Sequence, residues 1–327
     1  MVSRMLTILA HGDSDGICSA ALVLAALRRD YSEVNVVFTH PAGLIEDFTS
    51  SARGDVVIVD VALSEHNIKD LLATLNNYND GDITYIDHHP EPISDSLSEL
   101  NINVVHSLSM SASELTFKYY SKLGKLSSEY ERVALYGAIG DYRDETPWVK
   151  DVLEKWDKRQ IYFEAGILIQ GLEGSRRMYD FKRHVVEHLS VNRRPSQLGE
   201  LVVKALVEAS NNEMLYEWVR SNVNIDGSIA YVIDPPGSLG IAAVYARGTT
   251  GCEVGIAAER RNDLMIMSLR AGKNSIDLNR FLREVAVRLG GSGGGHPHAA
   301  GCRIPYRLFK ELIEKLNSEL RSLTQQP

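Results

Sequence analysis

Residues 5–29 read MLTILAHGDSDGICSAALVLAALRR, and this stretch decides the fold. Its first six residues form an apolar run that predicts a buried strand, and Gly16 to Arg29, rich in Ala and Leu, predicts a helix. Three ionisable residues, His11, Asp13 and Asp15, stand between the two elements. A continuous apolar strand that leads directly into a helix is typical of a parallel sheet with helices on both faces.

The same pattern recurs along the first half of the chain. Further strands are predicted at 34–39, 56–61, 83–86 and 102–105, and helices at 112–123, 128–139 and 149–172. In the second half, strands are predicted at 229–233, 252–258 and 264–269, with a turn at 261–263, and helices at 277–289 and 306–323. We therefore expect an α/β protein with an N-terminal parallel-sheet domain over residues 1–190 and a smaller C-terminal α/β domain with a mixed sheet over 226–327. A helical connector over 191–225 is expected to join them.

Composition narrows the classes of function. The chain has 327 residues with 35 Lys and Arg against 43 Asp and Glu, and its net charge of −8 argues against a basic field for gripping long nucleic acid. No apolar run is long enough to span a membrane, so no membrane partner is expected. Three cysteines are too few, and odd in number, for a disulfide framework, which predicts a reduced, cytoplasmic protein.

One local stretch departs from the acidic average. Residues 175–195 include Arg176, Arg177, Lys182, Arg183, Arg193 and Arg194 against Asp180 and Glu187, a local charge of +4 (six cations less two acids). Such a run predicts either a surface that follows the phosphates of a bound oligonucleotide or only a solvated helix face. The residues alone leave both interpretations open.

Acidic and histidine side chains follow several of the predicted strands. In chain order they are His11, Asp13, Asp15, Asp60, Asp87, His88, His89 and Asp141. Taken singly, an Asp after a strand is usually a helix cap or a turn residue. Because the carboxyl ends of parallel strands lie at one edge of a sheet, we expect these side chains to converge there. Clustered carboxylates repel one another unless a cation lies among them.

The ligand types indicate which cation would suit the cluster. Oxygen ligands alone would suit Mg²⁺, whereas mixed imidazole and carboxylate ligands favour Mn²⁺ or a similar transition metal. The candidate ligands exceed what one ion needs, which predicts a pair of ions. The sequence has no Cys-x-x-Cys pair, so a structural zinc site is not expected.

A second chemical signal is the run GGSGGGHPH at 290–298. One Gly would suffice to end the preceding helix, and the remainder predicts either a flexible loop or backbone kept bare for close approach to an anion. The run matches neither a Walker loop nor a dinucleotide-binding fingerprint. If it binds phosphate, the contacts would be Gly293, Gly294, Gly295 and His296, joined by Arg270 from the end of a predicted strand.

In these motifs the chain resembles the DHH phosphoesterase superfamily, in particular the branch that joins a DHH domain to a DHH-associated C-terminal domain. That branch includes RecJ-like nucleases, nanoRNases and 3'-phosphoadenosine 5'-phosphate phosphatases. The matching motifs are HGDSDG at 11–16, VIVDVAL around Asp60, DHH at 87–89, GAIGDY at 137–142 and GGGHPHAAG at 293–301. The resemblance implies a DHH catalytic domain over 1–190 and a DHH-associated substrate-binding domain over 226–327.

The resemblance also implies a two-metal site. Asp13 would bind one Mn²⁺ ion, and Asp15 and His88 would bind the other. Asp60 would bridge the two ions, and Asp141 would complete the shell.

Other roles follow from the same resemblance. His89 is expected to contact the substrate phosphate, and Asp87 is expected to orient the site from the second shell of side chains. Many nanoRNase-type members carry a metal-binding His four residues before the first Asp, where this chain has Leu9. Here the histidine stands two residues before that Asp, at His11, so its place among the metal ligands stays open.

These expectations combine into a function. We expect a metal-dependent phosphoesterase of the exonuclease or nanoRNase type, with two Mn²⁺ ions per site and Mg²⁺ as the alternative. It would degrade short single-stranded RNA or DNA oligonucleotides from the 5' end to mononucleotides by two-metal hydrolysis. One alternative is a small-molecule phosphatase or phosphodiesterase acting on 3'-phosphoadenosine 5'-phosphate, linear or cyclic dinucleotides, or polyphosphate. Another is a non-catalytic subunit of a replication or repair assembly, and the sequence is compatible with an oligomer.

Overall fold

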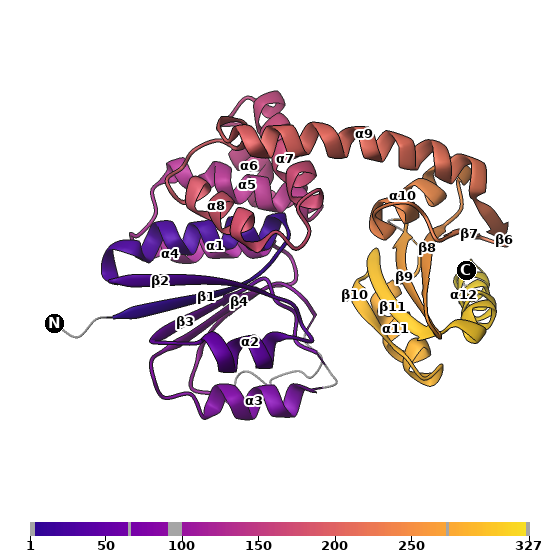
Figure 1. Cartoon of the computed structure of the whole chain (residues 1–327), viewed down its shortest axis with the longest axis horizontal. Helices are drawn as coiled ribbons and strands as arrows, with labels where there is room; N and C mark the ends of the chain where they lie inside the picture. The colour runs from indigo at the N-terminus through magenta and orange to yellow at the C-terminus, as the bar shows by residue number, and fades with distance from the viewer. Residues whose placement is uncertain (1–3, 65–66, 91–99, 273–274, 325–327) are drawn as a thin grey trace. The chain divides into compact units, whose positions relative to one another are not determined.

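The computed structural model describes residues 4–64, 67–90, 100–272 and 275–324. The chain divides into two compact units, Met1–Glu208 and Ala209–Pro327, and the division falls inside helix α9 (Gly199–Asn222). Each unit has its own sheet (Figure 1). Each unit also has its own hydrophobic cores. Over the described ranges, none of the helices combines the length and the apolar character needed to cross a membrane.

The first unit is built on a parallel sheet of five strands in the order β2-β1-β3-β4-β5. The strands are β1 (Met5–His11), β2 (Glu33–Thr39), β3 (Asp55–Val59), β4 (Ile83–Asp87) and β5 (Asn103–His106). Every pairing among them is parallel, with Leu9 opposite both Val37 and Ile58. The predicted parallel sheet is confirmed, and each strand ends within two residues of its predicted position.

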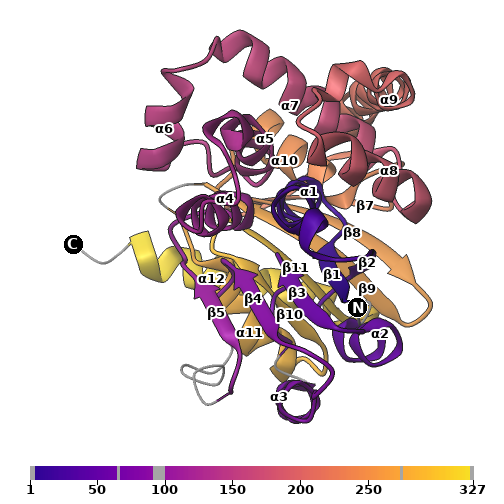
Figure 2. The ribbon, with the colours of Figure 1, turned by 90° about the vertical axis from the view of Figure 1, so that its left-hand side faces the viewer.

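Helices cover both faces of this sheet (Figures 1 and 2). One core includes α1 (Ser14–Leu27), α4 (Ala112–Lys122), α5 (Glu131–Gly140) and α8 (Tyr179–Ser190), and another includes α2 (Leu44–Ser51) and α3 (Ile68–Asn76). Strand residues alternate between the two cores: Ile8 and Ala10 belong to the first and Leu9 to the second. Because both faces are buried, the strands are continuous apolar runs.

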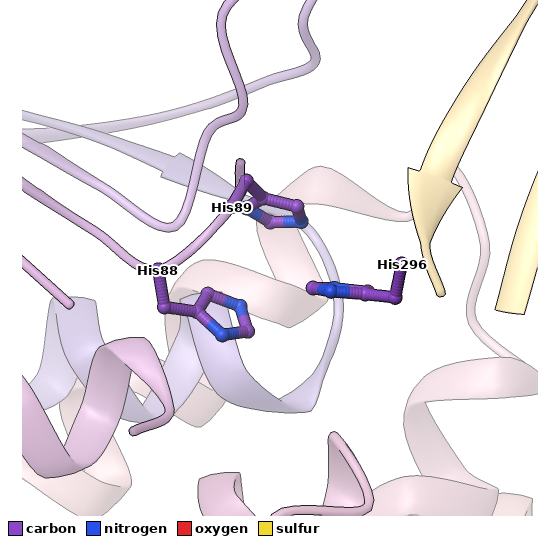
Figure 3. A group of neighbouring side chains, drawn as sticks. All are labelled: His88, His89 and His296. Atoms are coloured by element: carbon purple, nitrogen blue, oxygen red, sulfur yellow. The ribbon is translucent and has the colours of Figure 1, made fainter. Parts of the chain in front are cut away.

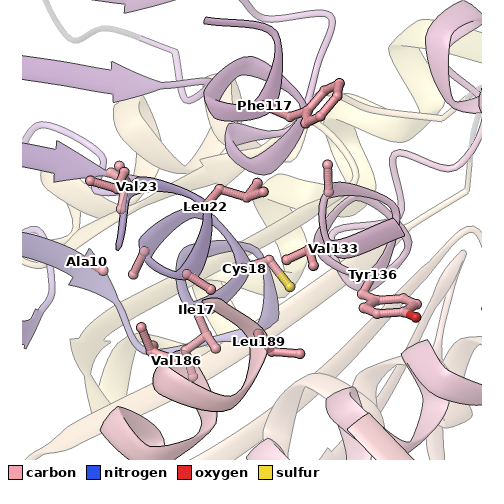
Figure 4. Close-up of a cluster of buried hydrophobic side chains, with 14 of the residues drawn as sticks. Ala10, Ile17, Cys18, Leu22, Val23, Phe117, Val133, Tyr136, Val186 and Leu189 are labelled. Atoms are coloured by element: carbon pink, nitrogen blue, oxygen red, sulfur yellow. The ribbon is translucent and has the colours of Figure 1, made fainter. Parts of the chain in front are cut away.

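Helix α1 lies in the middle of the first core. Its residues from Ile17 to Leu24 are at most 1% exposed, which is typical of a helix that is apolar on all sides. Figure 4 shows Cys18 beside Val133 of α5. The start of this buried helix carries Asp15 and is capped by Asp13, so two of the predicted ligands are attached to a rigid element.

Two helices stand where the sequence predicts one over 149–172. They are α6 (Pro147–Leu153) and α7 (Lys158–Glu173). The break occurs because the carboxylate of Asp157 accepts a hydrogen bond from the N–H of Arg159 and so caps a new helix. The helix predicted at 128–139 begins with a separate 3₁₀ turn, Ser128–Tyr130.

The second unit has a mixed sheet of six strands in the order β10-β11-β9-β8-β7-β6. The strands are β6 (Asn224–Asp226), β7 (Ile229–Ile233), β8 (Val254–Arg261), β9 (Leu264–Ala271), β10 (Ser292–His296) and β11 (Ala299–Pro305). The helices are α10 (Leu239–Thr250), α11 (Leu278–Arg288) and α12 (Phe309–Thr324). The β7–β8 pair is parallel and the other pairs are antiparallel, which confirms the predicted mixed sheet. The predicted turn between β8 and β9 is also present, with Asn262 at φ 55°.

Part of the glycine-rich run is an edge strand, whereas the sequence predicts a loop. Strand β10 pairs with β11, and Gly293 lies opposite Cys302. A Cβ at Gly293 would lie 2.6 Å from the Cβ of Cys302, and a Cβ at Gly295 would lie 2.7 Å from the carbonyl oxygen of Ala299. Close packing against β11 therefore requires glycine at these two positions, a structural reason that the sequence pattern did not reveal.

Candidate metal centre

The strand order places two acidic positions at one point of the sheet edge. The chain runs from β1 to β2 on one side of β1 and then to β3 on the other side, so the direction of the connections reverses at β1. Such a switch point is where open parallel sheets bind ligands, beyond the carboxyl ends of the strands. Asp13 follows β1 and Asp60 follows β3, which puts both residues at this point.

The loop from His11 to Gly16 is fixed by its own contacts. Asp13 caps α1, because its Oδ1 accepts a hydrogen bond from the N–H of Gly16 at 3.0 Å. A Cβ at Gly16 would lie 2.3 Å from the carbonyl oxygen of His11, so only glycine closes this turn. Oδ2 of Asp13 lies 2.8 Å from Nδ1 of His11, and the negative charge of Asp13 raises the pKa of His11.

Asp60 is held in an unusual conformation. Its φ of 57° lies in the left-handed region, which few residues other than glycine adopt, and the residue is 2% exposed. Its N–H donates to the carbonyl oxygen of Ile86 at 3.0 Å and so ties Asp60 to β4. Its oxygens lie near different histidines: Oδ1 is 3.3 Å from Nε2 of His88, and Oδ2 is 3.9 Å from Nδ1 of His11. Strained backbone of this kind concentrates at functional sites.

The predicted metal ligands fall into two groups. One group is His11, Asp13 and Asp60, the other is Asp15, His88 and Asp141, and the ligand atoms within each group lie within 4.8 Å of one another. In the second group, Nδ1 of His88 is 3.6 Å from Oδ2 of Asp141, and Nε2 is 3.9 Å from Oδ2 of Asp15. The structure thus brings six of the predicted residues together, and Asp60 approaches a histidine of each group.

Close packing of helices holds the second group in place. The carboxylate of Asp15 accepts hydrogen bonds from the N–H groups of Ala112 and Ser113, at 2.7 and 3.0 Å, at the start of α4. Asp141 directly follows the end of α5. Gly137, in the same helix, allows α5 to approach α1, because a Cβ at position 137 would lie 2.7 Å from Oδ1 of Asp15. Close packing between α5 and α1 therefore explains why the GAIGDY motif begins with glycine.

His88 and His89 follow β4, with their ring centroids 4.6 Å apart (Figure 3). Nδ1 of His89 lies 2.9 Å from Oδ1 of Asp87, and the hydroxyl of Tyr85 donates to Oδ2 of the same carboxylate at 2.9 Å. Burial alone would lower the pKa of His89, but the charge of Asp87 and its hydrogen bond raise this pKa to about 9. In the metal-free protein this pKa favours the imidazolium form of His89, and Asp87 orients the ring.

The electrostatics of the cluster fit bound cations. Burial raises the pKa of Asp60 well above its usual value, and the charges of Asp13 and Asp15 raise it further. Burial, together with the same two charges, also raises the pKa of Asp141. Burial lowers the pKa of His88, which favours the neutral imidazole that binds metals. Among the described residues, Oδ2 of Asp60 is buried and accepts no hydrogen bond. Buried carboxylates beside neutral imidazole form a donor set that suits divalent cations.

The remaining predicted contacts belong to the second unit. Arg270 of β9 and His296 of β10 both lie opposite Ala299 of β11, in one row across the sheet. Directly opposed residues point to the same face, so the two side chains stand on either side of Ala299 on one face. The N–H of Gly295 donates to Oδ1 of Asn279 at 3.1 Å, so this glycine has a partner within its own unit.

One cation beside the cluster was not among the predicted site residues. Lys182 of α8 is 6% exposed, and its Nζ donates to the carbonyl oxygen of Gly12, the neighbour of Asp13. Burial lowers the pKa of Lys182, and the charge of Asp13 opposes this shift. The sequence marks Lys182 only as part of a basic stretch, because the contact joins residues 170 positions apart.

Comparison with known families gives two matches. The model of the DHH family, N-terminal domain, matches residues 5–139, and the model of the DHHA1 domain matches residues 226–322. No match was found among curated proteins.

Solved structures of distant relatives share the fold. RecJ in complex with Mn²⁺ from Thermus thermophilus is 16% identical to this chain, with a TM-score of 0.70. The match covers 99% of this chain and 53% of the RecJ chain, so this chain spans about half the length of that relative. The pGpG-specific phosphodiesterase PggH from Vibrio cholerae is 13% identical with a TM-score of 0.57, and 98% and 99% of the two chains are covered. CDC45 from Entamoeba histolytica is 8% identical with a TM-score of 0.55, and 97% and 95% are covered. At these identities the likeness shows the fold alone.

Replacing Asp60 by Asn should stabilise the metal-free protein. Its pKa in the folded state lies above the unfolded value of about 4, so ionisation of Asp60 opposes folding as the pH rises above that value. In urea titrations with EDTA, Asp60→Asn should therefore raise the free energy of unfolding. The gain should grow between about pH 5 and about pH 7, by at most about 1.4 kcal/mol per pH unit.

The matched control is Asp151→Asn, which removes the same charge from an exposed position on α6. It should change the free energy of unfolding little at either pH. A metal-free Asp60→Asn protein that is less stable than wild type at both pH values would contradict carboxylate repulsion at the site.

Proposed function

Since the chain belongs to the DHH superfamily and joins a DHH domain to a DHHA1 domain, we propose that it is a metal-dependent phosphoesterase that degrades short single-stranded oligonucleotides. The observation that carries the proposal is the position of Asp60 at the switch point of the sheet: it belongs to one group of metal-ligand side chains and lies 3.3 Å from His88 of the other. Proteins that share the fold include one named exonuclease RecJ bound to manganese and one named pGpG-specific phosphodiesterase, which supports chemistry on phosphodiesters.

The two groups give the proposed ligand assignment. His11 and Asp13 would hold one divalent ion, Asp15, His88 and Asp141 would hold the other, and Asp60 would reach both. When bound, two such ions lower the pKa of a water molecule and neutralise the charge that develops on the phosphate. The mixture of imidazole and carboxylate donors favours Mn²⁺ over Mg²⁺.

His89 would contact the phosphate that is cleaved. Its imidazolium offers positive charge and an N–H donor to a phosphate oxygen, and Asp87 holds the ring through Nδ1. Tyr85 in turn holds Asp87, and its hydroxyl also lies 2.9 Å from the carbonyl oxygen of Val61. Because these contacts exist before substrate binds, His89 needs little reorganisation during the reaction.

The DHHA1 domain would bind a second phosphate. Arg270 and His296 lie on the same face of its sheet, on strands separated only by β11, and both side chains can donate to phosphate oxygens. Recognition of a terminal nucleotide by this domain would favour cleavage from a chain end, which we propose is the 5' end. The glycines of β10 would bring backbone close to that phosphate.

Two other functions remain as outcomes of the same test. A small-molecule phosphodiesterase would use the same ligands on a dinucleotide, the kind of substrate that the name of PggH gives for that protein. A non-catalytic subunit of a replication or repair assembly would share the fold without hydrolysing phosphodiesters. The presence of both ligand groups favours catalysis over a subunit that only assembles.

Hydrolysis should depend on Asp60. With Mn²⁺ and 5'-labelled single strands of about 2 to 20 nucleotides, the wild-type protein should release mononucleotides from one end. Asp60→Asn removes the charge that both ions would share, so turnover should fall by roughly 1,000-fold or more, whereas Asp151→Asn should behave as wild type.

The assay also separates the alternatives. Hydrolysis confined to dinucleotides or to 3'-phosphoadenosine 5'-phosphate would indicate the small-molecule enzyme, and a protein with neither activity nor bound metal would indicate the subunit. Turnover of Asp60→Asn above about a tenth of the wild-type value, equivalent to about 1.4 kcal/mol, would contradict the ligand assignment.

The choice of metal should follow the ligand types. Mn²⁺ should support faster turnover than Mg²⁺ because His88 and His11 offer nitrogen donors. Ca²⁺ should inhibit, because its larger and looser coordination misplaces the reacting groups. Initial rates after dialysis against EDTA and addition of each ion would measure the order, and equal rates with Mg²⁺ and Mn²⁺ would argue against histidine ligands.

A further inference from the structure

Ion pairs engage both acidic residues of the basic stretch 175–195 and leave the arginines at its two ends without an acidic partner from the stretch. Asp180 pairs with Arg183 at 2.6 Å, and Glu187 pairs with Arg28 at 2.7 Å, so both acids of the stretch are engaged. The arginines that these acids do not engage are Arg176 and Arg177, which precede α8, and Arg193 and Arg194, which follow it. The stretch therefore offers two separate cationic pairs, one at each end of one helix.

The first of these pairs is available to a ligand. Arg176 and Arg177 are both exposed. Among the residues that the structure describes, neither side chain forms a hydrogen bond or an ion pair. A guanidinium without an acidic partner can donate two parallel N–H bonds to a phosphate.

Helix α8 begins near the edge of the sheet that carries the metal ligands. Close to its start, Lys182 donates to the carbonyl oxygen of Gly12 in the loop between β1 and α1. Close to its end, Glu187 pairs with Arg28, which directly follows α1. Helix α1 has 14 residues, and at about 1.5 Å per residue it is roughly 21 Å long. The two contacts therefore lie at opposite ends of α1, and only the start of α8 is near Asp13.

The turn that carries Arg176 and Arg177 is tied to the same edge. Tyr179 stacks on Phe38, the penultimate residue of β2, with ring centroids 6.2 Å apart and an interplanar angle of 21°. The N–H of Met178 donates to the carbonyl oxygen of Ser175 at 2.7 Å, and the N–H of Tyr179 donates to that of Arg177 at 2.9 Å. This part of the backbone is thus ordered beside the carboxyl ends of β1 and β2.

We infer that Arg176 and Arg177 form a surface that binds the phosphates next to the one that is cleaved. Buried Lys182 holds the start of α8 beside Gly12 and so places this surface near the metal ligands. The inference rests on the proposed function and deepens it, because a surface of this kind selects substrates with several phosphates. Arg193 and Arg194 lie at the far end of α8 and do not take part. The first half of the basic stretch binds substrate, and the second half is a solvated helix end.

A pair of double variants tests this division. Arg176→Ala/Arg177→Ala removes two charges from the proposed surface, and Arg193→Ala/Arg194→Ala removes two charges from the other end of the same helix. With Mn²⁺, the first variant should raise KM for a single-stranded decamer by about 10-fold, change KM for a dinucleotide by less than about 2-fold, and leave kcat nearly unchanged. The second variant should match wild type on both substrates. The conservative variant Arg176→Lys/Arg177→Lys should retain most of the decamer affinity, because the charge is kept.

Equilibrium binding gives a readout that does not require turnover. Fluorescence anisotropy of the labelled decamer would be measured in the Asp60→Asn background, with and without the two arginines. Loss of two phosphate contacts should reduce the slope of log Kd against log salt concentration by about 1.4, at about 0.7 per contact for a single strand. An unchanged slope would overturn the inference.

The outcomes distinguish this inference from the proposed function. If wild-type protein hydrolyses oligonucleotides but the two double variants behave alike, or if dinucleotide and decamer are affected equally, the surface is rejected and the function stands. If wild-type protein hydrolyses no oligonucleotide of any length, the proposed function is rejected, and the salt dependence of decamer binding alone decides whether the surface exists.

Discussion

The burial of one carboxylate among several others constrains the whole first unit. Asp60 is almost inaccessible to water, and burial and neighbouring aspartates raise its pKa together. An acid in this position would ordinarily turn toward solvent or lose its charge. Its left-handed backbone and its hydrogen bond to Ile86 keep it where it is. This arrangement destabilises the metal-free folded state. A cation that binds only the folded state would compensate for that loss of stability.

The rest of the unit supplies rigid supports for that arrangement. Asp15 is attached to the start of the buried helix α1 and also accepts hydrogen bonds from the start of α4, so its carboxylate joins two helices. Gly16 and Gly137 permit the close approaches that these contacts need. Ligands fixed to helices and strand ends in this way are positioned before any ion or substrate arrives.

The sequence alone could predict the parallel sheet, and for a physical reason. Strands buried on both faces must be continuous apolar runs, and this is why β1 and β3 could be recognised. The gathering of Asp13, Asp60 and His88 could also be predicted, since parallel strands bring their carboxyl ends to one edge. The contact of Asp87 with His89 was not predicted, because the resemblance to a family implied only that Asp87 orients the site.

Other features were not predicted, either because the apolar pattern hid a local cap or because the contacts join segments far apart in the sequence. The cap at Asp157 divides a helix although the apolar residues continue on both sides of it. Strand β10 lacks the β-branched side chains that normally indicate a strand, and its glycines are explained only by the packing of β11. Lys182 and Gly12 are in contact although 170 positions separate them in the sequence, so the charge pattern could identify Lys182 as basic but could not predict this contact.

The central claim is that Asp60 joins two metal positions, and anomalous diffraction from crystals soaked in Mn²⁺ tests it most directly. The account predicts two manganese peaks roughly 3.5–4 Å apart, one beside His11 and Asp13 and the other beside Asp15, His88 and Asp141, with an oxygen of Asp60 on each. A single peak, or two peaks that Asp60 does not contact, would contradict the account.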